Sequence, residues 1–296
     1  MSLLERVVIV GATGQLGTDL LSVLTEFRPI VANRAAYDLG DHDAMRALVA
    51  RYRPTLVINT AAYHNVEHCE IHPERAMAIN AIAVDALAGV CALAGAALAH
   101  VSTDYVFDGR SGRAYDEDDG VNPISAYGVS KAAGEQLLRR HGERHFIIRT
   151  SGLYGRAGSS TKGYTFVERI LAQAERNEPI RVVNDMTFSP SYTRDVARTM
   201  RAIFERGAFG TYHVTNAGAC TWYEFASEAI RLAELHPSDM APVSYTSFDS
   251  YIGRPIFSAL AHTRLERERI QPPPSWQFGL AAYVAERRTT LGVPSI

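Results

Sequence analysis

Short runs of hydrophobic, mostly β-branched residues recur along the first half of the chain, and longer segments rich in alanine and leucine separate them. Such short apolar runs are typical of strands that are buried on both faces of a parallel sheet. The longer segments, notably residues 73–96 and 130–141, have the spacing of helices. Strands that alternate with helices predict βαβ units with right-handed crossovers. The predicted strands are residues 7–10, 30–32, 56–59, 97–102 and 146–149.

Beyond residue 150 this alternation becomes less regular. Thr193 is a candidate N-cap for one of the helices there, and a run at 212–215 is expected to be the last strand of the main sheet. We therefore expect an α/β fold, a doubly wound parallel sheet with a smaller C-terminal lobe. The elements predicted in this half are helices over 166–176, 193–206, 222–234 and 276–286 and strands over 180–183 and 212–215.

The composition of the chain indicates which partners to expect and in which cellular compartment the protein lies. With 296 residues, of which 47% are hydrophobic, the chain can bury a large core. A net charge of −2 gives no general attraction to nucleic acid or to an anionic membrane, so neither is expected as a partner. No uninterrupted apolar run has membrane-spanning length, and the N-terminus lacks the pattern of a signal peptide. Three scattered cysteines suit a reducing environment, and a cytoplasmic location is expected.

A glycine-rich turn follows the first predicted strand. Gly11, Gly14 and Gly17 are spaced G-x-x-G-x-x-G, and leucines at helical spacing come after them. Gly11 allows the tight turn, Gly14 lets a pyrophosphate approach the backbone, and Gly17 lets the helix pack on the strand. The pattern predicts a Rossmann-like dinucleotide-binding domain over residues 1–150, rejoined by roughly 187–218. Residues 151–186 and 219–296 would then form the substrate-binding lobe.

The end of the second predicted strand bears on the choice of cofactor. An acidic residue that would bind the ribose hydroxyls of NAD is missing there, and Asn33 and Arg34 occupy the position instead. A guanidinium suits a 2′-phosphate. We therefore predict NADPH, with NADH as the alternative, and interpret Asn33 and Arg34 as cofactor-binding residues.

Tyr127 and Lys131 lie four residues apart and so share one face of a helix. A nearby ammonium stabilises a phenolate, so Lys131 is expected to lower the pKa of Tyr127 from its usual ~10 towards neutrality. Thr103 and Asp104 stand at the end of another predicted strand, the edge where doubly wound sheets bind their ligands. These four residues are the candidate catalytic group.

Several ordered motifs together resemble an extended short-chain dehydrogenase/reductase and, within that superfamily, the dTDP-4-dehydrorhamnose reductase family. The resemblance runs nearly from end to end, which makes it more specific than any single motif. The segments that carry it are residues 11–17, 59–63, 102–109, 122–123, 126–135, 149–155, 221–226 and 254–260.

The resemblance implies roles for individual residues. Tyr127 matches the family's proton donor, and Lys131 matches its partner, which also binds the nicotinamide ribose. Thr103 matches the hydroxyl that holds the substrate carbonyl, with Asp104 beside it. The implied reaction delivers hydride to the C4 ketone of a nucleotide-linked deoxysugar, and Tyr127 protonates the resulting alkoxide. The positions that match cofactor-lining residues are Gly14, Gln15, Leu16, Asp38, Leu39, Ala61, Ala62 and Tyr63.

One residue departs from the family pattern. The family commonly carries an aromatic residue after Thr-Ser, on which substrate packs, whereas this chain has Gly152. The departure leaves the identity of the nucleotide-sugar open. Two alternatives to a reductase remain within the superfamily, a non-catalytic regulatory subunit and a nucleotide-sugar 4-epimerase. The oligomeric state is open too, with a homodimer among the alternatives.

Two further segments were weighed for function. His64, His68 and His72 have a spacing that could place metal ligands on one helical face. Because the segment follows a strand and ends at Pro73, we expect a loop with surface histidines and no metal site. The glycine-rich stretch at 155–163 is interpreted as a mobile loop that either closes over substrate or only connects two elements.

Overall fold

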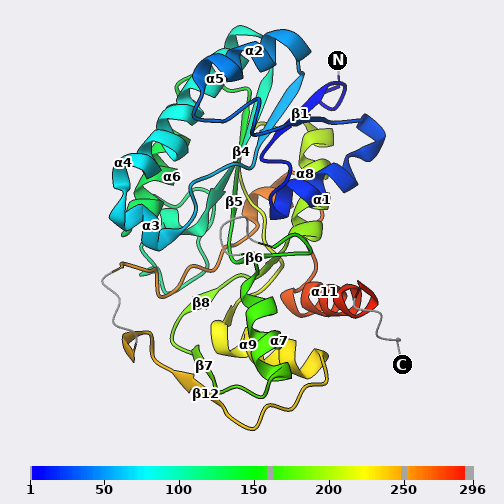
Figure 1. Ribbon diagram of the computed structural model, residues 1–296. Coiled ribbons are helices and arrows are strands. Elements are labelled where there is room, and N and C mark those ends of the chain that lie inside the picture. The colour runs from blue at the N-terminus through cyan, green and yellow to red at the C-terminus, as the bar shows by residue number, and fades with distance from the viewer. Residues whose placement is uncertain (1, 159–162, 248–251, 291–296) are drawn as a thin grey trace.

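The computed structural model describes residues 2–158, 163–247 and 252–290. A six-stranded parallel sheet forms the upper part of the molecule in Figure 1, in the order β10-β5-β4-β3-β1-β2. The order changes direction at β1, so a ligand is expected beyond the carboxyl ends of the strands near β1 and β3. The predicted doubly wound fold is confirmed. The strands are β1 Val7–Val10, β2 Ile30–Ala32, β3 Leu56–Asn59, β4 Ala97–Thr103, β5 His145–Thr150 and β10 Gly210–His213.

Helices cover both faces of this sheet (Figure 1). Side chains alternate along a strand, so Val7 and Ile9 face one core and Val8 and Val10 face the other. The first core is covered by α1 (Gln15–Val23) and α8 (Thr193–Arg206). The second is covered by α2 (His42–Tyr52), α5 (Ala83–Leu93) and α6 (Ala126–Arg139).

The helix predicted over 73–96 is broken into three parts: α4 (Pro73–Met77), the π-helical turn η2 (Ala78–Ile82) and α5. By length and composition alone, Pro73–Leu93 is long and apolar enough to cross a membrane. In this structure its parts pack against α2 and α6. A further short helix, α3 (Val66–Ile71), precedes it, where a loop was expected.

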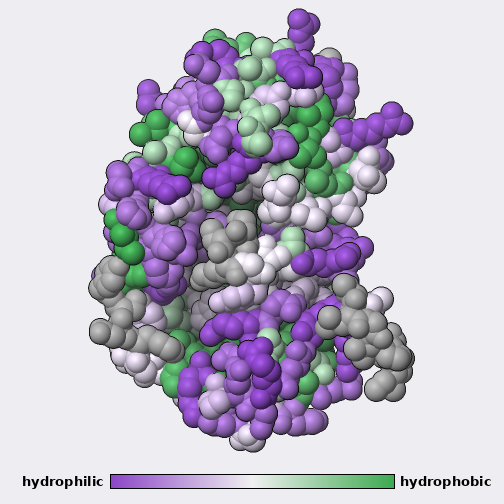
Figure 2. All heavy atoms as spheres, in the orientation of Figure 1, coloured by the Kyte–Doolittle hydropathy of each residue, from purple (hydrophilic) through white to green (hydrophobic). Residues whose placement is uncertain are grey.

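The C-terminal lobe lies below the sheet in Figure 1 and has its own core, built largely from α7, α9 and α11. Figure 2 shows that hydrophilic residues cover most of the face drawn there, and hydrophobic ones form small, separate patches. The remaining elements are β6 Leu153–Tyr154, α7 Phe166–Glu175, β7 Ile180–Val183, β8 Thr187–Phe188, β9 Ser191–Tyr192, β11 Cys220–Thr221, α9 Trp222–Leu232, β12 Met240–Val243, α10 Thr263–Arg267, α11 Trp276–Thr290, η1 Thr25–Phe27, η3 Asp104–Val106 and η4 Tyr245–Ser247.

Some predicted boundaries were wrong. The last strand of the sheet is β10, which begins and ends two residues earlier than expected. α6 begins before the predicted residue 130 because the Ser125 hydroxyl accepts a hydrogen bond from the Gly128 N–H and caps it. Thr193 is not a cap. Its hydroxyl donates instead to Asp19 on α1, which joins the two helices on that face of the sheet.

Candidate active site

The glycine turn after β1 leaves the start of α1 open. Gly11 has a φ of +80°, and a Cβ there would lie 2.6 Å from Thr60 Oγ1; a Cβ on Gly17 would overlap the Gly11 carbonyl oxygen. Gly14 precedes α1, which has neither a side-chain cap nor an acidic residue in its first turn. The N–H groups there are therefore suited to an anion. Gln15 Oε1 is buried at the same point without a hydrogen-bond partner in the described part of the chain.

The expected adenine end of the site lies after β2. The Arg34 side chain is 86% exposed, and its Nε lies 3.1 Å from Asp38 Oδ2. A hydrogen bond from the Gly40 N–H, followed by Arg34, lowers the pKa of Asp38. The Asn33 side-chain oxygen accepts a hydrogen bond from the backbone N–H of Ala35. The Leu39 side chain packs into the second core of the sheet domain, and its place near the adenine stays a prediction.

Asn80 holds the loop that follows β3, which contains Ala61, Ala62 and Tyr63. Its Oδ1 accepts from the Tyr63 N–H at 2.8 Å, and its Nδ2 donates to the Tyr63 carbonyl at 2.9 Å. The same Nδ2 lies 3.0 Å from Ser130 Oγ on α6. Sequence reasoning missed Asn80. Its signal was a lone asparagine in an otherwise apolar, alanine-rich segment, and it lies in the π-helical turn, a feature common at functional sites.

Tyr127 and Thr103 come together at the carboxyl edge of the sheet. Tyr127 lies in the first turn of α6 and Thr103 is the last residue of β4, and their side chains lie close enough for Thr103 to influence the pKa of Tyr127. Burial raises the pKa of Tyr127 above its ordinary value, while Thr103 acts the other way. The phenol is therefore protonated at neutral pH. The Tyr127 side chain is only partly buried, so it remains accessible from the site.

Asp104 lies under this pair and is buried. It accepts hydrogen bonds from Thr103 Oγ1 at 3.0 Å, Ser151 Oγ at 2.7 Å and Ser258 Oγ at 2.6 Å. Burial raises the pKa of Asp104, and these three hydroxyls oppose the shift. Asp104 was predicted among the catalytic residues. Its carboxylate holds the Thr103 hydroxyl in place, and a catalytic role for Asp104 stays a prediction.

Lys131 shares the helix face of Tyr127 but points its amine elsewhere. Nζ lies 2.7 Å from the Val101 carbonyl oxygen and 2.9 Å from His100 Nε2. Burial lowers the pKa of Lys131 to about 7, and Glu135 opposes this shift. The expectation that Lys131 lowers the pKa of Tyr127 was therefore wrong for this structure, since burial dominates the pKa of both groups.

A buried ion pair fixes α6 against the sheet. Arg149 on β5 donates from Nε and Nη2 to the two carboxylate oxygens of Glu135, at 2.9 and 2.7 Å. Burial opposes ionisation of Glu135, but the hydrogen bond and charge of Arg149 leave its pKa lowered. The bidentate geometry sets the rotation of α6 and hence the face on which Tyr127 and Lys131 stand.

Gly152, the departure from the family pattern, faces an aromatic ring from another strand. Its φ is +49°, and a Cβ there would lie 2.6 Å from Phe188 Cδ2. Phe188 is stacked on Trp222, with ring centroids 3.8 Å apart. The Phe188 ring, on β8, thus occupies the space that a side chain at position 152 would enter. Ser151, which donates to Asp104, is adjacent, so this aromatic stack borders the site.

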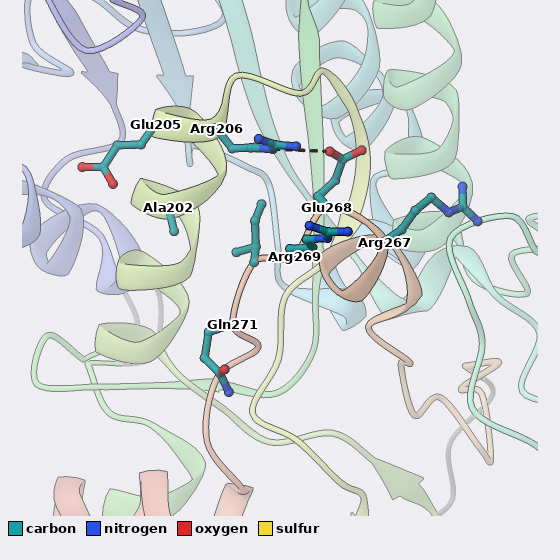
Figure 3. A pocket seen from close by; sticks show the side chains of 8 residues that line it. Ala202, Glu205, Arg206, Arg267, Glu268, Arg269 and Gln271 are labelled. Atoms are coloured by element: carbon teal, nitrogen blue, oxygen red, sulfur yellow. Dashed lines mark ion pairs between the residues drawn. The ribbon is translucent and has the colours of Figure 1, made fainter.

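A separate cavity of about 480 Å³ lies between the end of α8 and the segment after α10 (Figure 3). Arg206 and Glu268 face each other across it, with Nε and Oε2 3.7 Å apart. Because α8 leads into the start of β10, this cavity lies at the amino ends of the strands. It is not the site described above.

Two segments remain, the one that carries His64, His68 and His72 and the glycine-rich stretch at 155–163. Among the residues that the structure describes, no group of three His, Cys, Asp or Glu side chains is placed to hold a metal. His68 lies within α3 and His72 at its end, so these histidines are not on a simple loop. Of the stretch at 155–163, residues 159–162 lie outside the described part of the chain, and its role as a lid stays a prediction.

Comparison with known proteins places this geometry in context. A family model described as the RmlD substrate binding domain matches residues 5–289. The chain is 36% identical to the spore coat polysaccharide biosynthesis protein SpsK of Bacillus subtilis, over 96% of this chain and 98% of that protein. It is 35% identical to the dTDP-4-keto-6-deoxy-D-glucose reductase of Streptomyces niveus, over 93% and 95%.

A solved structure is similar throughout. The dTDP-4-dehydrorhamnose reductase of Bacillus anthracis, crystallised in complex with NADP, superposes with a TM-score of 0.91 at 35% identity. The match covers 97% of this chain and 100% of that one.

Proposed function

Since the chain belongs to the family described as the RmlD substrate binding domain, we propose that it is an NADPH-dependent oxidoreductase that reduces the C4 ketone of a nucleotide-linked deoxysugar. The observation that carries this proposal is the convergence of Tyr127 and Thr103 at the carboxyl edge of the sheet. Its cytoplasmic location is supported by three cysteines, Cys69, Cys91 and Cys220, that are free and buried.

The residues present suit the cofactor. The glycine turn and the open start of α1 would hold the diphosphate, and the unpartnered Gln15 Oε1 is a further polar group there. Arg34 would receive the 2′-phosphate, exchanging its contact with Asp38 for the stronger negative charge. NADPH, when bound, supplies the hydride.

The chain's own residues manage the proton. Tyr127, kept neutral by its raised pKa, donates its phenolic proton to the oxygen at C4 as negative charge develops there. Thr103 lies beside that phenol, and Asp104 fixes the Thr103 side chain by accepting a hydrogen bond from its hydroxyl. Lys131 lies four residues from Tyr127 on the same helix, and its amine donates to the Val101 carbonyl oxygen.

Tyr127→Phe tests the assignment. With a panel of nucleotide-linked 4-keto-6-deoxysugars, the wild-type enzyme should oxidise NADPH, seen as a loss of its absorbance. The variant should lose about 10²–10⁴-fold in kcat and keep its affinity for NADPH, because the hydroxyl serves the chemical step.

Tyr212→Phe is the matched control. It also removes one tyrosine hydroxyl, but that hydroxyl donates to the Ala208 carbonyl at 2.6 Å, away from the site, so turnover should persist. Full activity in Tyr127→Phe, or no net oxidation of NADPH by the wild type with any such sugar, would refute the proposal. The second result would favour the epimerase or the regulatory alternative.

A further inference from the structure

Thr150, the last residue of β5, carries a hydroxyl that no other group in the described part of the chain bonds. The residue is 4% exposed, and its Oγ1 is buried without a hydrogen-bond partner. Protein interiors rarely keep such a group, because a hydroxyl that leaves water without gaining a partner costs free energy. The mechanism above gives Thr150 no task, and a hydroxyl held in this way is suited to a ligand.

The other buried polar atoms that lack a partner among the described residues have a different setting. Ser102 lies on the side of the sheet that faces Glu135 and lowers the pKa of that carboxyl. Tyr154 belongs to the core of the C-terminal lobe, and Arg264 lies at the amino end of β10. Gln15 alone shares the carboxyl edge of the sheet with Thr150 in this set, and it stands at the start of α1.

Strand register places Thr150 beside the reacting groups. It is directly opposite Thr103 in the parallel pairing of β5 with β4, and neighbouring strands lie about 4.8 Å apart. Thr103 in turn lies beside Tyr127, the proposed proton donor. A ring that gives hydride to the carbonyl that Tyr127 protonates must therefore lie at the ends of these two strands, within reach of Thr150.

The Thr150 side chain also faces the side of the sheet on which the diphosphate is proposed to bind. Ile148, two residues earlier, belongs to the core under α1 and α8, and the alternation of side chains directs Thr150 to that same side. Arg149, between them, faces Glu135 on α6 instead. A dinucleotide that starts at α1 and follows the carboxyl edge of the sheet would thus arrive at Thr150.

We propose that Thr150 is a cofactor-binding residue whose hydroxyl hydrogen-bonds the carboxamide of the nicotinamide ring. The inference rests on the proposed function, because it requires NADPH at this edge of the sheet. The carboxamide has one acceptor oxygen and two N–H donors, and a threonine hydroxyl both donates and accepts, so the two groups are complementary. A bond to the carboxamide sets the rotation of the ring and hence the face that it turns towards the substrate.

The same hydroxyl is a cost to the free protein. Replacing an unpartnered buried hydroxyl by a methyl group removes a desolvation penalty, so Thr150→Val should leave the ligand-free protein as stable as the wild type or more stable. The substitution also removes the proposed bond to the cofactor. Stability of the free protein and affinity for NADPH are therefore expected to respond differently, whereas the loss of a purely structural hydroxyl would lower stability alone.

Titration calorimetry with two ligands tests the proposal without any sugar substrate. Adenosine 2′,5′-bisphosphate carries the adenine end of NADPH but no nicotinamide. In Thr150→Val the dissociation constant of NADPH should rise about 3–10-fold, as the loss of one hydrogen bond predicts, and that of the bisphosphate should stay the same. Thermal unfolding of the ligand-free variant should occur at the wild-type temperature or above it.

Thr165→Val is the matched control. Thr165 is equally buried, at 4% exposed, but its hydroxyl accepts a hydrogen bond from the Glu168 N–H at 3.2 Å and caps α7 in the C-terminal lobe. This variant should lose stability and keep its affinity for both ligands. Thr150→Ser, which retains the hydroxyl, should bind NADPH as the wild type does.

Unchanged binding of NADPH to Thr150→Val, or an equal loss of affinity for both ligands, would overturn the inference and leave the reductase proposal in place. A wild type that does not bind NADPH at all would instead contradict the proposed function, and the inference with it. Should Thr150→Val fail to fold, Thr150→Ala compared with Thr150→Ser makes the same test, because these two variants differ by the hydroxyl alone.

Discussion

Lys131 buries an amino group that ordinarily remains in water, with 1% of its surface exposed. Its folded-state pKa of about 7 lies below the 10.5 of an unfolded lysine. The folded protein therefore binds fewer protons than the unfolded chain between these values, and folding is penalised for this residue at neutral pH. Function and stability make opposite demands on the position.

Lys131→Met should raise the melting temperature by a few degrees at neutral pH while abolishing turnover. The penalty in the wild type is fully present below its folded pKa of about 7 and is lost as pH rises towards 10.5. Thermal unfolding followed at several pH values should thus show a gain that shrinks to nothing at alkaline pH. Arg140→Met, which removes an exposed charge from the end of the same helix, should show no such trend. A gain independent of pH would contradict the assigned cause.

Some of the candidate site residues can be picked out from the sequence, and others cannot. Tyr127, Lys131 and Thr103 stand out by spacing and by position at a predicted strand end. His100 and Asn80 do not, because their partners lie on other elements and are known only once strand register and helix packing are known. The prediction that Lys131 acts on Tyr127 was wrong for the same reason. Sequence spacing shows which helix face a side chain shares, but it does not show the rotamer that the side chain adopts.

At the scale of elements, the close approach of α6 to the π-helical turn η2 lets Asn80 bond both the loop of Tyr63 and Ser130 of α6. The approach depends on Gly134, where a Cβ would overlap the carbonyl oxygen of Asn80. A backbone atom cannot move aside cheaply, so the separation of these two elements is set by the absence of a side chain.

Gly134→Ala should therefore cost about 1–3 kcal/mol of unfolding free energy and reduce kcat/KM, as measured by denaturant unfolding and NADPH oxidation. Gly89→Ala is the matched control within α5. Its Cβ would meet only the His141 ring at 3.2 Å, and alanine is the better helix former, so stability should hold or rise. Equal effects of the two substitutions would argue against the packing explanation.

Most sheet strands and the longer C-terminal helices were predicted within a few residues because apolar periodicity is a local signal. The π-helical turn was not predictable, as its residues, Ala78–Ile82, continue the pattern of an ordinary helix. The cap assigned to Thr193 failed because a long-range partner, Asp19, takes the hydroxyl that a local cap would have used.

At the scale of the whole molecule, Asp104 joins the sheet to the chain segment that returns from the C-terminal lobe. Ser151 follows β5, and Ser258 belongs to the returning segment, whose N–H also donates to the Thr187 carbonyl on β8 at 2.9 Å. The orientation of Thr103 thus depends on the C-terminal half of the protein being in place.

Ser258→Ala should remove one hydrogen bond to a buried carboxylate, at a cost of about 1.5–3 kcal/mol, and should lower kcat/KM by loosening Thr103. Ser189→Ala is the control, because Ser189 is equally buried and bonded to Gly218 and Leu260 but does not touch Asp104. It should lose stability and keep its catalytic efficiency. A normal kcat/KM in Ser258→Ala would show that Asp104 does not transmit this contact.

The sequence predicts a division into two halves, since the regular alternation of strands and helices ends near residue 150. The replacement of a side chain at Gly152 by the ring of Phe188 was not, because it joins strands that lie far apart in sequence. The Phe188 ring therefore shapes the region beside Ser151. The sugar that this region accepts has to be identified by screening substrates.

The transfer of deuterium to the sugar from NADPH that carries two deuterium atoms at C4 of the nicotinamide tests the central claim most directly. After reaction with a nucleotide-linked 4-keto-6-deoxysugar, mass spectrometry and proton resonance should find one deuterium, bonded to C4 of a product that carries a hydroxyl there. A ketone recovered unchanged, or a product without deuterium at C4, would contradict the account.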